Sequence, residues 1–119
     1  MRRTRSERPS LGRPPYEIST LRRRLGLVLS AAGAREAYLF GSYARGDADE
    51  DSDVDLAIIA DTMLPFVERF KQFTAVLDAV PEAELLVYTP REWEEMRRDG
   101  ASFYLGITEH CVELVREAS

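Results

Sequence analysis

The sequence has one cysteine, Cys111, and one histidine, His110, among its 119 residues. A single cysteine excludes an intramolecular disulfide and is typical of proteins of the reducing cytoplasm, where we expect this chain to act. We interpret Cys111 as a small, partly buried hydrophobic residue rather than as a reactive thiol. His110 lies far in the sequence from the motifs described below, so we interpret it as a surface or helix-capping residue.

The sequence also lacks long apolar runs. None approaches the ~18 residues that a membrane-spanning helix needs, so we expect no contact with a membrane. The arginine-rich N-terminus has no apolar segment of the kind found in secretory signals. No GxxxxGKS or GxxxxGKT motif is present, which excludes the P-loop class of NTPases.

The composition is 45% apolar and 31% charged, which is typical of a soluble domain with one hydrophobic core. The net charge of −5 is unevenly distributed, because residues 1–15 are rich in arginine whereas residues 41–61 are strongly acidic. We interpret 1–15 as a flexible basic leader and 16–119 as one domain. We expect no contact with nucleic acid beyond that leader.

Apolar periodicity predicts a chain in which helices and strands are interspersed. The predicted helices are 19–32, 64–79, 89–98 and 102–109, and the predicted strands are 37–40, 54–59 and 84–88. Residues 111–115 fit either an edge strand or the end of a helix. This order predicts the α/β (α+β) class, with a single small mixed sheet flanked by helices.

Two aromatic features of the predicted helices have two interpretations each. Phe66, Phe70 and Phe73 recur at helical spacing, which suits core packing or, if they are exposed, an interface. Trp93 follows the helix start Thr89-Pro90, and the same two interpretations apply to it.

The densest chemical feature is the segment FGSYARGDADEDSDVDLAII, residues 40–59. Asp53 and Asp55 lie two residues apart beside an apolar strand, so their carboxylates project from the same face. Two such carboxylates both stay ionised when a cation lies between them. Mg²⁺ takes oxygen ligands of this kind and shares them with substrate phosphates. We therefore predict a metal site on Asp53 and Asp55, with Glu84, at the start of the next apolar strand, as the third carboxylate.

Gly41 and Ser42 directly follow the first predicted strand. Glycine lets the backbone approach a ligand closely, and a hydroxyl with backbone N–H groups at a helix start favours phosphate. A phosphate site beside paired carboxylates provides the groups that phosphoryl or nucleotidyl transfer with two metal ions requires.

An EF-hand does not explain the acidic segment. That loop needs glycine at its sixth position and glutamate at its twelfth, and counting from Asp47 or Asp49 supplies neither. We interpret the remaining acidic residues as a solvated connector: Asp47, Asp49, Glu50 and Asp51.

The run GSYARG followed by SDVDL resembles the GSxARG…SDxDL signature of the polymerase-β-type nucleotidyltransferase superfamily. The short single-domain form, the minimal nucleotidyltransferase (MNT) family, is the most similar, over about residues 18–116. The resemblance implies that Gly41 and Ser42 hold a nucleoside triphosphate. It also implies that Asp53 and Asp55 ligate two Mg²⁺ ions.

In that family a third-strand carboxylate ligates one metal and orients the attacking hydroxyl. The family usually has aspartate there, whereas this chain has Glu84, which is one methylene longer. Arg45 lies within the signature and has two open roles, contact with phosphate or an ion pair with the acidic loop. Tyr43 either stacks on a base or packs in the core.

The resemblance implies an Mg²⁺-dependent enzyme that moves a nucleoside monophosphate, AMP from ATP, onto a hydroxyl. Proteins of this kind commonly act as antitoxins by modifying a HEPN-type RNase toxin, often on a tyrosine, so a HEPN-type partner is expected. The alternative is a binding module of little or no activity that neutralises its partner by contact. A third option, an aminoglycoside-type transferase, normally needs a further domain. Homo- or hetero-oligomers are both compatible with the sequence.

Overall fold

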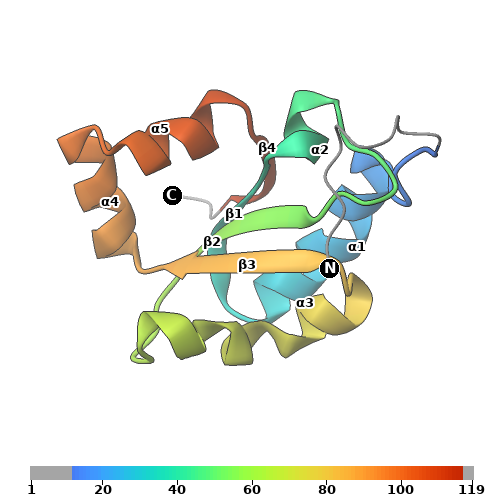
Figure 1. Cartoon of the computed structure of the whole chain (residues 1–119). Helices are drawn as coiled ribbons and strands as arrows, with labels where there is room; N and C mark the ends of the chain where they lie inside the picture. Colours follow the sequence, from blue (N-terminus) through green and yellow to red (C-terminus); the bar gives the residue numbers. More distant parts are fainter. Residues whose placement is uncertain (1–11, 117–119) are drawn as a thin grey trace.

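A mixed four-stranded sheet lies between two pairs of helices in the computed structural model, which describes residues 12–116 (Figure 1). The elements are α1 (Ile18–Ala31), β1 (Ala34–Phe40), α2 (Ser42–Arg45), β2 (Val54–Ala60), η2 (Phe66–Phe73), α3 (Thr74–Ala79), β3 (Ala83–Tyr88), α4 (Pro90–Asp99), α5 (Ser102–Glu109) and β4 (Val112–Arg116). The strand order is β3-β2-β1-β4. β1 runs antiparallel to β2 and β4, and β2 runs parallel to β3, so the predicted mixed sheet is confirmed.

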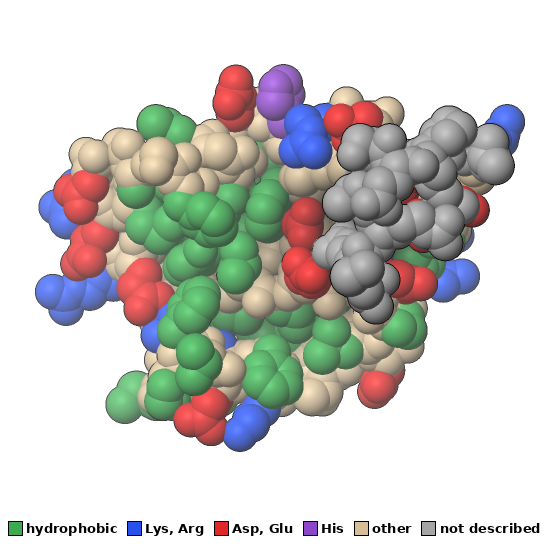
Figure 2. All heavy atoms as spheres, in the orientation of Figure 1, with side chains coloured by type: hydrophobic (Ala, Val, Ile, Leu, Met, Phe, Trp, Pro, Cys, Tyr) green, Lys and Arg blue, Asp and Glu red, His purple; other side chains and the backbone are tan. Residues whose placement is uncertain are grey.

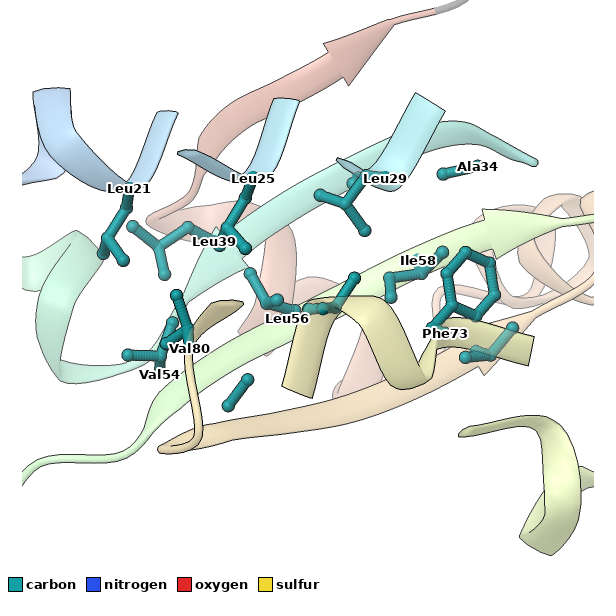
Figure 3. Packing of buried hydrophobic residues seen from close by; sticks show 14 of the residues in the cluster. Leu21, Leu25, Leu29, Ala34, Leu39, Val54, Leu56, Ile58, Phe73 and Val80 are labelled. Carbon is teal, nitrogen blue, oxygen red and sulfur yellow. The ribbon is translucent and has the colours of Figure 1, made fainter. Parts of the chain in front are cut away.

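The two faces of the sheet have different environments because side chains alternate along each strand. Val54, Leu56 and Ile58 of β2 project to the face covered by α1 and α3, where all three are fully buried. Leu21, Leu25 and Leu29 of α1 point into the same cluster (Figure 3). Burial of a side chain of this size contributes about 1.5–3 kcal/mol, so this cluster is the main core.

The opposite face is covered by α4 and α5, but only over part of its length. Ala57 and Ile59 of β2 lie beneath Trp93 of α4 and Ile107 of α5 in a second, smaller cluster. Trp93 is 8% exposed and its ring lies 4.7 Å from that of Tyr104, which settles its interpretation as a core residue. Asp53 and Asp55 project from this same face, by the alternation that buries their neighbours on the other side.

The predicted helix 64–79 is wrong in its form, because the segment divides into the 3₁₀ helix η2 and the short α-helix α3. A 3₁₀ helix has about three residues per turn, so side chains three apart align. This places the guanidinium of Arg69 over the ring of Phe66, 5.5 Å from its centroid. Of the aromatic stripe, Phe73 is fully buried whereas Phe66 and Phe70 are 45% and 44% exposed.

Arg69 is a buried cation that joins η2, β3 and α4, a role that no sequence pattern predicted. Its side chain is 8% exposed and donates to the carbonyl oxygens of Leu64 and Val87, at 3.0 Å each. Two further bonds, of 2.6 and 3.1 Å, reach the two carboxylate oxygens of Glu92. Glu92 also completes the predicted capping box with Thr89 at the start of α4. The hydrogen bonds from Arg69 hold the pKa of Glu92 below its ordinary value.

The C-terminal part of the chain contains an edge strand. Residues Val112–Arg116 form β4, an edge strand, and His110 is the exposed C-cap residue of α5. Cys111 is half-buried and burial raises the pKa of its thiol, which favours the unreactive form. Residues 1–11 of the predicted leader lie outside the described residues. Within residues 12–116, no helix has the length and apolar character required to cross a bilayer.

Candidate active site

A cavity of about 460 Å³ opens beside the ends of β1 and β2 that carry the signature residues. Five of the six predicted site residues line it: Gly41, Ser42, Arg45, Asp53 and Asp55. Its opposite wall comes from α5, through Ser102, Phe103, Gly106 and Ile107, and Phe40 completes the lining. The fold therefore brings the two ends of the signature to one opening, at the part of the sheet that α4 and α5 leave uncovered.

Gly41 and Asp55 are in close contact at the edge of this cavity. Phe40 pairs with Asp55 across β1 and β2, so the chain turns into α2 directly beside the Asp55 carboxylate. A Cβ atom at position 41 would lie 2.2 Å from Oδ2 of Asp55, well inside van der Waals contact. Gly41 also has φ 75° and ψ −151°, a region that is essentially restricted to glycine. Both the backbone and the carboxylate therefore require glycine here.

Ser42 begins the short helix α2 and is buried, at 8% exposure. The first N–H groups of any helix have no acceptor within the helix and carry partial positive charge. Gly46 ends the helix in the left-handed conformation, and its N–H donates to the carbonyl oxygens of Ser42 and Tyr43. Tyr43 itself is 3% exposed and belongs to the main core, so it packs rather than facing a ligand.

Arg45 lies at the rim of the cavity with its side chain half exposed. Its Nε lies 3.5 Å from Oδ2 of Asp47, a long contact between two exposed groups. Pairs of this kind contribute little, typically below about 1 kcal/mol, so Asp47 does not fix the guanidinium in place. Both roles predicted for Arg45, ion pairing and contact with phosphate, are compatible with this position.

Glu84 is the direct neighbour of Asp55 in the parallel pairing of β2 and β3. Paired residues of adjacent strands project to the same face, so Asp53, Asp55 and Glu84 share one face of the sheet. Glu84 is exposed and is not among the residues that line the cavity. Within residues 12–116, no three Asp, Glu, His or Cys side chains converge closely enough to hold a metal ion. Asp53 and Asp55 alone still fit Mg²⁺, which usually binds through one or two carboxylates plus substrate phosphates.

The acidic loop before β2 is more ordered than a solvated connector, and for Asp49 that prediction was wrong. Asp49 is 7% exposed, and its Oδ1 accepts hydrogen bonds from the backbone N–H of Asp51 and from Oγ of Ser52, at 2.9 and 3.3 Å. The backbone N–H of Asp49 in turn donates to Oγ of Ser52, at 2.9 Å. This local network fixes the loop that leads into Asp53. The other three acidic residues are exposed as predicted: Asp47, Glu50 and Asp51.

Sequence reasoning missed the contribution of α5. The segment was predicted as a helix, but nothing in its pattern indicated that it faces the carboxylates. The sequence feature that could have pointed to this role is Gly106. A glycine in the interior of a helix lowers the stability of that helix, so its presence there suggests another function.

The sequence matches the family model described as a nucleotidyltransferase domain over residues 22–108. A protein from Methanocaldococcus jannaschii, whose name assigns it provisionally as a protein adenylyltransferase, is 34% identical over 64 residues, 50% of this chain and 64% of the relative. The protein adenylyltransferase MntA of Thermococcus cleftensis is 44% identical over 48 residues, 38% of this chain and 48% of the relative. The chain thus spans about half to two thirds of the length of these relatives.

Solved structures have the same fold. One described as a minimal nucleotidyltransferase has a TM-score of 0.56 at 24% identity, and covers 82% of this chain and 96% of its own. A toxin–antitoxin structure with AMP-PNP has a TM-score of 0.57 at 22% identity, over 80% of this chain and 73% of its own. A complex of a tri-AMPylated HEPN toxin from Shewanella oneidensis with its MNT antitoxin has a TM-score of 0.50 at 19% identity. The match covers 80% of this chain and 69% of the chain in that structure. The resemblance carried by GSYARG and SDVDL is confirmed, and the chain belongs to the nucleotidyltransferase domain family.

Proposed function

We propose that this protein is an Mg²⁺-dependent nucleotidyltransferase that moves AMP from ATP onto a hydroxyl of a HEPN-type toxin and thereby acts as its antitoxin. The observation that carries the proposal is the cavity shared by Gly41, Ser42, Asp53 and Asp55, within a chain of the nucleotidyltransferase family. Two carboxylates and a backbone that turns into a helix start provide the groups that a metal-bound triphosphate requires.

In the proposed reaction the acceptor oxygen attacks the α-phosphorus of ATP. A new P–O bond forms, the bond from the α-phosphorus to the bridging oxygen breaks, and pyrophosphate leaves. Gly41 and Ser42 hold the phosphates in line for this displacement. Glu84, beside Asp55, accepts the proton of the attacking hydroxyl as a general base. Magnesium ions held by Asp53 and Asp55 would supply the positive charge that offsets charge on the phosphates.

A protein acceptor is supported by relatives and by the surface. The relative from Thermococcus cleftensis is named a protein adenylyltransferase, and one similar structure holds a tri-AMPylated HEPN toxin with its MNT antitoxin. This chain also exposes apolar side chains along η2 and on α5. Figure 2 shows hydrophobic side chains gathered across the middle of one face. The exposed apolar residues of η2 and its approach are Met63, Leu64, Phe66, Val67 and Phe70.

The test is a transfer assay with the full chain, α-labelled ATP, Mg²⁺ and a purified HEPN-type protein encoded beside its gene. We expect label on the partner, and we expect its loss in the Asp53→Asn/Asp55→Asn double variant and in EDTA. Asp78→Asn, an exposed aspartate of α3, is the matched control and should retain transfer. Unlabelled partner in the presence of folded wild-type protein would overturn the catalytic proposal.

A second candidate function is neutralisation of the partner by contact alone, and the exposed apolar residues of η2 favour it. The same double variant separates the two candidates. If the Asp53→Asn/Asp55→Asn protein still inhibits the partner without transferring label, contact is sufficient. In that case Phe66→Ser/Phe70→Ser should abolish inhibition, since it removes the two half-exposed rings.

A further inference from the structure

The wall of the cavity that faces the carboxylates is one side of α5. Four residues of α5 line the cavity: Ser102, Phe103, Gly106 and Ile107. Along the helix Ser102 and Gly106 lie four residues apart, as do Phe103 and Ile107, and Phe103 lies three residues from Gly106. Residues at this spacing share one face of an α-helix. Ile107 is buried and anchors the helix to the sheet, whereas Ser102, Phe103 and Gly106 are exposed to the cavity. The sheet side of the cavity is charged and the α5 side is not.

Phe103 is a large aromatic side chain that is 51% exposed at this wall. Trp93, Tyr104 and Tyr88 pack together in the second core cluster, but Phe103 is not part of that cluster. A half-exposed aromatic ring beside a polar cavity offers a flat apolar surface. Such a surface suits a nucleobase, because stacking on an aromatic side chain contributes substantially to binding of bases.

Gly106 leaves open space at the same wall. It is an interior residue of α5, where glycine destabilises a helix by roughly 0.5–1 kcal/mol relative to alanine. Its φ is not positive, and a Cβ atom added there would meet nothing within 4 Å. Gly26 of α1 is also an interior helix glycine without a positive φ, but an added Cβ atom there would lie 3.7 Å from the carbonyl oxygen of Leu114, whereas at Gly106 it would meet open space. What the missing side chain provides is open space in the cavity.

From these observations we infer that Phe103 and Gly106 form the nucleobase subsite, with the base stacked on Phe103 and lying in the space above Gly106. This inference rests on the proposed function, which places the triphosphate at Gly41 and Ser42 on the opposite wall. Stacking tolerates any base but favours larger rings. The subsite therefore selects purine over pyrimidine nucleotides by stacking area, with little discrimination between adenine and guanine.

The first test is titration calorimetry of the full chain with ATP, GTP, CTP and UTP in the presence of Mg²⁺. We expect ATP and GTP to bind with similar affinity and the pyrimidine nucleotides more weakly. Phe103→Ala should weaken ATP binding by about tenfold, and Phe103→Trp should retain it. Leu105→Ala is the matched control, because Leu105 is 54% exposed on the same helix but does not line the cavity. Its ATP affinity should equal that of the wild type.

The second test fills the space above Gly106. Gly106→Leu should retain or raise the melting temperature, because leucine is a strong helix former, and should abolish ATP binding. If wild-type ATP binding is lost in Asp53→Asn/Asp55→Asn but is unchanged in both Phe103→Ala and Gly106→Leu, the base subsite is overturned and the proposed function stands. If folded wild-type protein binds no nucleotide with Mg²⁺, both are overturned.

Discussion

Oδ2 of Asp55 occupies the space that a side chain at position 41 would need, 2.2 Å from the site of the missing Cβ atom. The glycine of the signature therefore does more than admit a ligand. It makes room for a carboxylate of the same signature, so the GSYARG and SDVDL parts of the motif depend on each other sterically.

Gly41→Ala should be destabilising for two separable reasons, the positive φ of the backbone and the clash with Asp55. Backbone strain of this kind costs about 1–3 kcal/mol, and the clash adds to it. Chemical denaturation of Gly41→Ala, with and without Asp55→Ala, measures the two terms in a double-mutant cycle. The cost of Gly41→Ala should be smaller in the Asp55→Ala background. Gly46→Ala is the control, since Gly46 has φ 84° but no atom within 4 Å of an added Cβ. Equal costs in both backgrounds would show that the clash is relieved by rotation of Asp55.

Glu84→Gln should lower the rate of AMP transfer by about 10²-fold or more, the usual contribution of a positioned general base. ATP affinity should change little, because Glu84 does not line the cavity. Rapid-quench kinetics and calorimetry measure the two quantities separately. Glu84→Asp should retain most of the transfer rate, and Glu109→Gln, an exposed glutamate of α5, should retain all of it. A Glu84→Gln protein with the wild-type rate would show that Asp53 and Asp55 suffice.

Asp49→Ala should destabilise the domain by about 1–2 kcal/mol, because it leaves the N–H of Asp51 and the hydroxyl of Ser52 without this acceptor. Asp49→Asn retains a side-chain oxygen and should lose less stability than Asp49→Ala. Asp47→Ala removes an exposed side chain whose contact with Arg45 is long, and it should change stability by less than about 0.5 kcal/mol. Urea denaturation measures the free energy of unfolding of all three variants. Equal stability of the alanine variants would indicate that the loop is solvated at both positions.

Glu92→Gln should cost about 1.5–3 kcal/mol at pH 7, the range for hydrogen bonds to charged groups. The pKa of Glu92 is lowered in the folded state by Arg69. The stabilisation is therefore fully present above the ordinary pKa of 4.5 and is lost as the pH falls through the lower folded value. Denaturation curves of the two proteins should converge as the pH falls below that range. Glu94→Gln breaks an exposed pair with Arg97 on the same helix and serves as the control, with a small effect. A constant difference across this pH range would assign the stabilisation to packing.

Three strands, α1 and the capping box of α4 could be predicted because each has a local cause, such as the apolar, β-branched run of β2 or the Thr89–Glu92 pair. For β4 the sequence left an edge strand and a helix end as alternatives. β1 begins at Ala34, earlier than predicted, because the polar residues Arg35 and Glu36 join a strand that pairs on both sides. Arg69 could not be predicted, since its partners lie 18 and 23 residues away. The role of α5 could not be predicted either, because it depends on contacts between segments far apart in the sequence. The turn at Gly100 directs α5 to the cavity, but the local sequence does not indicate what the helix packs against.

The aromatic cluster beneath α5 has a practical consequence. Trp93 is the single tryptophan of the chain, and its ring is packed between Tyr38 of the sheet and Tyr104 of α5. Tyr104 is next in sequence to Phe103, so any displacement of that helix changes the surroundings of the indole. The molecule thus contains one built-in fluorophore whose emission reports on the cavity wall, without a label and at the concentrations at which nucleotide is titrated.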